Sequence, residues 1–228
     1  MLKLVPILLA ILYALAMYRF SMWRTTKALD TQSHPLQERE ITRLADKMAV
    51  ALGLPQIKVH VYRIDPINGL AAPDGRIFLT QGFIAAFKSG VVTAEELASV
   101  IAHELGHVAL GHTRRRMIDF TGQNAVFMML SAVLNRFIPG IGMVIARTVS
   151  SALAARLSRR DEHEADAYAS ALLVKAGIGT APQKSLFRKL DKLTGAAGTG
   201  TPAWLLSHPH TDDRIRAIEA REARWLQG

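Results

Sequence analysis

A chain of 228 residues can enclose one substantial hydrophobic core, and with 50% apolar and 21% charged residues it is typical of a folded protein. The absence of cysteine excludes both a disulfide framework and thiolate metal ligands. A net charge of +9 favours an anionic partner. Because the basic residues are scattered and not interleaved with aromatic ones, we expect this partner to be membrane lipid and not nucleic acid.

The first 24 residues are predicted to be a membrane anchor or a signal segment. Residues 4–18 carry no charge, and a helix that continues to Trp23 while Arg19 reaches back toward the headgroups is about 20 residues long, enough to cross the hydrocarbon core. In the alternative interpretation, Ala14 and Ala16 mark a cleavage site and the segment is removed. We favour the anchor, because the residues after this site make a poor mature terminus.

The rest of the chain is predicted to form a polar linker, 25–37, and one domain, 38–228. In the domain, apolar residues recur mostly at helical spacing. Two short segments are instead predicted to be strands, one of them because apolar and polar residues alternate along it. One helix start is well marked, because Thr93 and Glu96 have the spacing of a capping box. The predicted elements are helices over 38–52, 93–111, 141–174, 186–193 and 212–226, and strands over 57–62 and 76–80. The predicted fold class is therefore mainly α with a small β-sheet.

The apolar stretch Ala125–Leu134 allows two interpretations. It is too short to span a bilayer. A buried core helix and a hydrophobic hairpin that dips into the membrane explain it equally well.

Residues 103–107 read His-Glu-Leu-Gly-His inside the helix predicted from Thr93. Histidines four residues apart lie on one face of a helix, where both rings can reach one cation, and neutral imidazole suits zinc. Glu104 is turned about 100° from His103 around the helix axis, so it is better placed to reach a metal-bound water than the metal itself. Zinc lowers the pKa of such a water, and a carboxylate can take its proton as it attacks a peptide carbonyl. The motif therefore predicts a zinc peptidase with one Zn²⁺ per chain.

A catalytic zinc ion takes three protein ligands, so a third must come from elsewhere in the chain. His112 is nearest in sequence, but on a continuous helix it lies about 140° from His107. The metzincin pattern is excluded, because it requires histidine where this chain has Thr113. Glu162 and Asp166 are better candidates, since they are four residues apart and share a helix face with small residues. Such a face allows one helix to pack closely enough for a carboxylate to reach a metal on its neighbour.

Several further segments accompany these two motifs: Glu95–Leu97, Val100–Ala102, Asn68–Pro73, Gly75–Thr80, Ser207–Pro209 and Arg214–Ile215. In combination, roughly over residues 38–220, they resemble the membrane-associated zinc metallopeptidase family of HtpX, BepA and the CaaX prenyl proteases. The resemblance implies a zincin-type domain in which the helix of the His-Glu motif packs against the helix of Glu162. It is nearest to the compact BepA-like branch, because the interval between the two motifs lacks the long apolar helices of other branches.

Carried over residue by residue, the resemblance implies that His103, His107 and Glu162 bind zinc. It makes Glu104 the general base. Asp166 would orient a ligand histidine from outside the coordination sphere.

The resemblance also implies roles for residues near the substrate. His208 would lie near the metal, where it either stabilises the oxyanion or blocks the open position, and His210 leaves open which of the two histidines faces the metal. Arg214 would secure the site. The strand made of Arg76, Ile77, Phe78, Leu79 and Thr80 would be the edge along which an extended substrate pairs its backbone.

The sequence thus predicts a zinc metalloendopeptidase that cleaves misfolded or membrane-associated proteins. We expect it at a bacterial inner membrane on a single amino-terminal anchor. The side of the catalytic domain is left open by the flanking charges, and signal cleavage would make it periplasmic. The alternative function is a zinc-containing chaperone or assembly factor with little proteolysis, against which the intact Glu104 argues. A nucleic-acid-binding protein is disfavoured by the dispersed basic charge.

Overall fold

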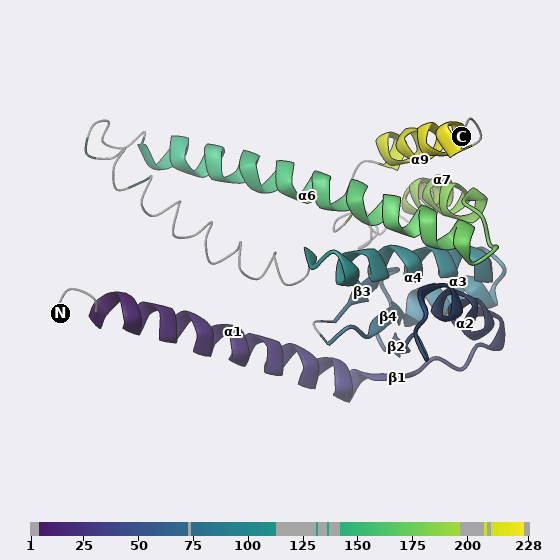
Figure 1. Cartoon of the computed structure of the whole chain (residues 1–228), viewed down its shortest axis with the longest axis horizontal. Helices are drawn as coiled ribbons and strands as arrows, with labels where there is room; N and C mark the ends of the chain where they lie inside the picture. Colours follow the sequence, from purple (N-terminus) through teal and green to yellow (C-terminus); the bar gives the residue numbers. More distant parts are fainter. Residues whose placement is uncertain are drawn as a thin grey trace.

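The computed structural model describes residues 5–72, 74–112, 131, 136, 142–196, 208 and 211–225. Its central element is helix α4 (Ala94–Ala109), which packs against the long helix α6 (Gly142–Lys175) on one side and against the sheet on the other (Figure 1). This arrangement confirms the predicted fold class, mainly helical with a small sheet. The His-Glu motif at residues 103–107 of α4 is therefore shielded from water by α6 and the sheet.

The remaining helices surround this pair. Helix α2 (Arg39–Leu52) packs on α4 and α6, and α3 (Gln81–Lys88) lies against the sheet. Helix α7 (Ala181–Ala196) packs on α4, α9 (Thr211–Trp225) packs on α6, and α7 and α9 pack on each other. The predicted end of α2 is confirmed, because Gly53 adopts a left-handed conformation with a φ of 68°. Helix α3 was not predicted. It begins directly after a strand, where the side chain of Thr80 accepts a hydrogen bond from the backbone N–H of Phe83.

Four short strands form one mixed sheet in the order β1-β2-β4-β3. They are β1 (Ser33–Pro35), β2 (Val59–Tyr62), β3 (Gly69–Ala71) and β4 (Ile77–Thr80). The two outer pairs are antiparallel and the central pair, β2 and β4, is parallel.

The predicted position of strand 76–80 at the edge of the sheet is wrong. Strand β4 has hydrogen-bonded neighbours on both sides, and all four of its residues are buried. The edge is occupied by β3, for which no strand was predicted. β3 and β4 form a hairpin whose turn contains Gly75, with a φ of 86°, and the pairing of β3 with β4 displaces β4 from the edge.

Helix α1 (Val5–Gln32) runs beyond the predicted anchor. Residues 25–35, predicted as part of a polar linker, instead continue α1 through Gln32 and then form β1. Tertiary contacts hold this segment in place: Leu29 is buried with Ala72 and Phe78, and the carboxylate of Asp30 accepts a hydrogen bond from Arg76 at 2.7 Å. The carboxyl end of α1 is thereby fixed against the β3–β4 hairpin.

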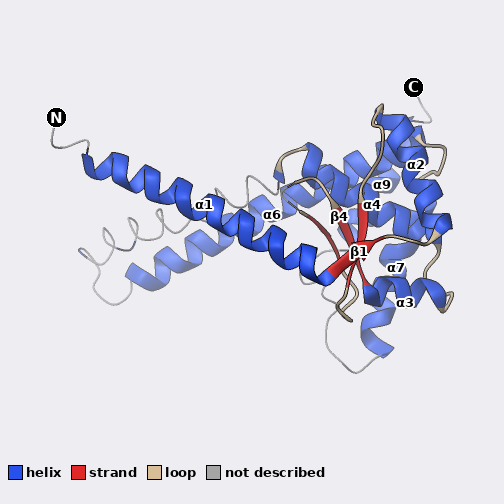
Figure 2. Ribbon diagram, turned by 90° about the horizontal axis from the view of Figure 1, so that it is seen from below, coloured by secondary structure: helices blue, strands red, loops and turns tan. Residues whose placement is uncertain are grey.

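Helices α1 and α6 both extend away from the globular part of the protein in the same direction (Figures 1 and 2). Large apolar side chains on the extended part of α1 are exposed, including Leu12 at 55% and Trp23 at 57%. Among the described residues, no helix combines the length and the apolar composition needed to cross a bilayer. The stretch Ala125–Leu134 lies, apart from Ser131, outside the described residues.

Candidate metal centre

Helix α4 carries the His-Glu motif into the interior. Its start is fixed by the predicted capping box, in which Thr93 Oγ1 accepts from the N–H of Glu96 and the Glu96 carboxylate accepts from the N–H of Thr93. His103 and His107 follow on one face of the helix, and both are buried. Their Nε2 atoms lie 3.1 Å apart. The two rings therefore converge on one point.

Helix α6 presents two carboxylates to this pair, one at each ring nitrogen of His103. Glu162 Oε2 lies 3.3 Å from His103 Nε2, and Glu162 Oε1 lies 3.4 Å from His107 Nε2. Asp166 Oδ1 instead accepts a hydrogen bond from His103 Nδ1 at 2.9 Å. Glu162 thus faces the point where the Nε2 atoms converge, whereas Asp166 fixes the orientation of the His103 ring.

A close crossing of α4 and α6 brings these groups together. A Cβ atom added to Gly106 would lie 2.9 Å from the backbone oxygen of Ala165 and 3.0 Å from its Cα atom. Ala165 and Ala169, on the predicted small-residue face of α6, are fully buried. Gly106 is the counterpart on α4, a role that was not predicted from the sequence.

Replacing Gly106 with Ala is expected to destabilise the domain by about 1–3 kcal/mol and to weaken metal binding, because the backbone of α6 must move away from α4. In an ordinary helix interior the same change stabilises by about 1 kcal/mol, so the sign of the effect is diagnostic. Urea unfolding and metal content measure the two effects. An unchanged or increased free energy of unfolding would contradict the close crossing.

His208, from the last part of the chain, reaches the same point as Glu162. Its Nδ1 lies 2.6 Å from Glu162 Oε2 and 3.3 Å from His103 Nε2, and its Nε2 lies 3.6 Å from Glu104 Oε1. The side chain is buried. His210, the other candidate, lies outside the described residues.

Arg214 on α9 is only 2% exposed, and it contacts both Asp166 and the backbone of His208. Its Nε and Nη2 donate to the two oxygens of Asp166 at 2.6 and 2.8 Å. Its Nη1 donates to the backbone oxygen of His208 at 3.2 Å. The guanidinium also lies over the ring of Phe187, 4.3 Å from its centroid.

These contacts shift the protonation of the buried groups. Burial raises the pKa of Glu162, but hydrogen bonds from His103 and His208 outweigh it and hold that pKa well below its usual range. Burial likewise raises the pKa of Asp166, and the charge and hydrogen bonds of Arg214 outweigh it. Burial lowers the pKa of His208 to about 4. For His103 burial is outweighed by the hydrogen bonds to Asp166 and Glu162, which raise its pKa to about 9. A bound cation must therefore displace a proton from His103.

The donor set fits a zinc ion. The ligating atoms of His103, His107, Glu162 and His208 all lie within 4.8 Å of one another. A tetrahedron with zinc–ligand bonds of about 2.0–2.1 Å has edges of about 3.3 Å. The two Nε2 atoms lie 3.1 Å apart, and each lies 3.3 or 3.4 Å from one of the two carboxylate oxygens of Glu162, distances close to that edge length. Two imidazoles and one carboxylate are also a ligand set found in catalytic zinc sites.

The family model described as Peptidase family M48 matches residues 35–222 of the chain. The chain belongs to peptidase family M48. Membership confirms the family resemblance predicted from the motifs. Together with the buried His-His-Glu cluster, it makes the protein a zinc metalloendopeptidase that acts on polypeptides.

Individual M48 relatives are similar over most of this chain. Metalloprotease LoiP of Escherichia coli is 27% identical over 197 residues, which cover 86% of this chain and 75% of LoiP. Metalloprotease YcaL of the same organism is 30% identical over 190 residues, or 79% of this chain and 69% of YcaL. A putative beta-barrel assembly-enhancing protease of Vibrio cholerae is 31% identical over 166 residues, 70% of this chain but 33% of that protein.

His112, which was not favoured as a zinc ligand from the sequence, lies against the M48 centre. His112 was placed about 140° from His107 on the assumption of a continuous helix. Helix α4 instead ends at Ala109, and Gly111 adopts a left-handed conformation with a φ of 70°, so His112 does not lie on a continuation of this helix. The Nδ1 atoms of His112 and His107 consequently lie 3.0 Å apart. The available signal was Gly111, because glycine commonly ends helices in this conformation.

Proposed function

We propose that this M48 peptidase cleaves misfolded or membrane-associated polypeptides at a zinc ion held by His103, His107 and Glu162. The observation that carries the proposal is that the buried Nε2 atoms of His103 and His107 and the carboxylate of Glu162 lie within 3.1–3.4 Å of one another, next to a buried carboxylate, Glu104. A bound zinc ion would supply Lewis acidity, which lowers the pKa of a water molecule and polarises the scissile carbonyl.

Glu104 performs the proton transfers in this proposal. It follows His103 directly on α4, is only 3% exposed, and has Oε1 3.6 Å from His208 Nε2. Its carboxylate accepts a proton from the attacking water and returns it to the leaving amine. Asp166 and Arg214 keep the His103 ring oriented while this occurs.

We propose that substrate binds along β3. Among the described strands β3 is at one edge of the sheet, and it packs against α4, which carries the reacting groups. Backbone pairing at an edge strand requires an extended polypeptide but depends little on the sequence of that polypeptide. This mode suits misfolded substrates.

His208 is proposed to block the open coordination position in a resting state. Its Nδ1 points at Glu162 and His103, where a fourth ligand would lie. A catalytic zinc site needs this position for water. The competing role, stabilisation of the oxyanion, would instead require His208 to face the substrate carbonyl.

Replacing His208 with Ala is expected to raise the rate of cleavage of a short peptide and to speed the loss of zinc to a chelator, because one protein ligand is removed. Initial rates and chelator kinetics measure these effects. A fall in kcat with unchanged zinc loss would favour the oxyanion role.

Membrane contact is proposed for the two extended helices. α1 exposes Leu12, Phe20 and Trp23, and α6 exposes Met143 and Val144, on segments that point the same way (Figure 2). With a net charge of +9, we expect binding to anionic vesicles that weakens with salt. The predicted location at a bacterial inner membrane remains a prediction.

Proteolysis itself is tested with the purified full chain and an unfolded polypeptide. Cleavage is expected with zinc, should stop after metal chelation, and should return on adding zinc. If the zinc-loaded protein leaves the polypeptide intact but prevents its aggregation, the chaperone alternative is correct.

A further inference from the structure

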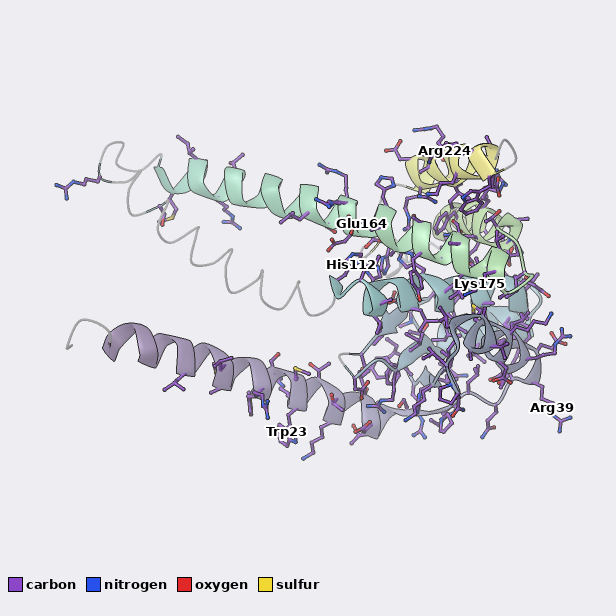
Figure 3. The ribbon with its side chains drawn as sticks, viewed as in Figure 1. Trp23, Arg39, His112, Glu164, Lys175 and Arg224 are labelled. Atoms are coloured by element: carbon purple, nitrogen blue, oxygen red, sulfur yellow. The ribbon has the colours of Figure 1, made fainter. Side chains whose placement is uncertain are left out.

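A second cluster of metal-ligating residue types lies next to the proposed zinc site, at the carboxyl end of α4. It consists of His112, Asp161 and Glu164, and we call it the His112 cluster. His112 is completely buried and Asp161 is 5% exposed. Figure 3 shows His112 at the end of α4 with Glu164 of α6 beside it. None of the roles derived above uses this cluster.

The contacts of His112 run through both edges of its ring. Its Nδ1 lies 3.0 Å from His107 Nδ1, and the two ring planes are inclined at 68°. Its Nε2 lies 3.2 Å from Glu164 Oε2 and 3.7 Å from Asp161 Oδ1. His112 therefore stands between a proposed zinc ligand and two carboxylates.

The proposed role of His107 as a zinc ligand determines which ring nitrogens of His107 and His112 carry a hydrogen atom. His107 directs Nε2 at the proposed zinc position, so in its neutral form the hydrogen is on Nδ1. Two N–H groups cannot face each other at 3.0 Å, so His112 Nδ1 must accept this hydrogen bond. Its own hydrogen is then on Nε2 and is donated to Glu164.

The same assignment argues against a second metal ion. The nitrogen of His112 that faces Asp161 and Glu164 carries a hydrogen in this arrangement, and its other nitrogen is occupied by His107. Neither has an electron pair free for a cation. The His112 cluster thus completes the first site instead of forming another.

We propose that His112 is a positioning residue that accepts the Nδ1 hydrogen of His107 and thereby fixes the tautomer and orientation of this zinc ligand. The inference rests on the zinc ligands named under the proposed function. The two histidine ligands are then oriented in different ways. His103 is oriented directly by the carboxylate of Asp166, whereas His107 is oriented by the imidazole of His112, which in turn donates to Glu164. Such supporting partners typically contribute about 10–100-fold to metal affinity.

Two amide variants test the proposal. In His112→Asn the side-chain oxygen can take the place of Nδ1 and still accept from His107. In His112→Gln the amide lies one carbon further out, near Nε2 and Glu164, and His107 loses its acceptor. We expect zinc affinity, measured by competition with a chelator, to fall by about 10–100-fold in the Gln variant and to remain near the original value in the Asn variant.

A general loss of packing would affect both amides alike, so equal affinities in the two variants would overturn the proposal. Arg160→Ala, which removes an exposed partner of Glu164, is the matched control and should leave zinc affinity unchanged. ¹⁵N NMR of the zinc-loaded protein supplies an independent test. It should find hydrogen on Nδ1 of His107 and on Nε2 of His112, and hydrogen on Nδ1 of His112 would contradict the inference.

The parent assignment is tested separately with His107→Ala and Glu162→Ala. Both should lose zinc if the ligand set is right, whatever the result at His112. If they keep zinc, the ligand assignment itself fails. If they lose zinc while both amide variants bind it normally, only the role of His112 is refuted.

Discussion

Replacing Glu104 with Gln is expected to lower the rate of peptide hydrolysis by about 10²–10⁴-fold, with zinc retained. The amide has nearly the same shape as the carboxylate and can remain in its buried position next to His103, but it cannot accept a proton from the attacking water. kcat/KM for an unfolded substrate and the zinc content of the purified protein measure the two parts of this prediction.

Glu95→Gln is the matched control, because Glu95 lies on the same helix but is exposed in its first turn. It should not change the rate. A Glu104→Gln protein that keeps zinc and cleaves at nearly the original rate would show that another group is the base. Equal inactivity of both the original and the variant, with client binding intact, would favour a chaperone.

Replacing Arg214 with Met is expected to reduce the free energy of unfolding by about 3–5 kcal/mol, because the charge of Asp166 is then left buried without its partner. Asp166 is completely buried and receives two hydrogen bonds from Arg214. Zinc affinity should fall as well, since Asp166 orients His103. Denaturant unfolding and chelator competition measure the two effects.

Two further variants isolate the cause of this loss. Arg216→Met removes a 69% exposed arginine from the same helix and should cost less than about 1 kcal/mol. Adding Asp166→Asn to Arg214→Met removes the stranded charge and should recover part of the stability. If Arg214→Met alone unfolds like the original protein, Asp166 must find another countercharge.

The sequence was most informative where structure is determined locally. The capping box of Thr93 and Glu96 and the end of α2 at Leu52 depend on neighbouring residues, and both were predicted. The convergence of His103 and His107 likewise follows from one turn of helix. The closeness of Glu162 to these histidines was predicted as well, because small residues on α6 indicated a close helix crossing.

Features that depend on distant pairing were missed. β3 takes the edge of the sheet because it pairs with β4, and no property of Gly69–Ala71 alone specifies that partner. α1 continues past residue 24 because Leu29 packs against Ala72 and Phe78, which lie far along the chain. His112 was misplaced for a local reason, since α4 ends at Ala109 and Gly111 adopts a left-handed conformation before His112.

The docking of Leu29 and β1 also bears on how a shortened protein should be prepared for crystallisation. A fragment starting at residue 38 would keep every proposed zinc ligand, yet it would lack β1 and expose the backbone of β2 as a new edge prone to pairing with other chains. It would also uncover the buried surfaces of Ala72 and Phe78. The shortest well-behaved fragment should therefore begin ahead of Leu29, with only the exposed apolar turns of α1 removed.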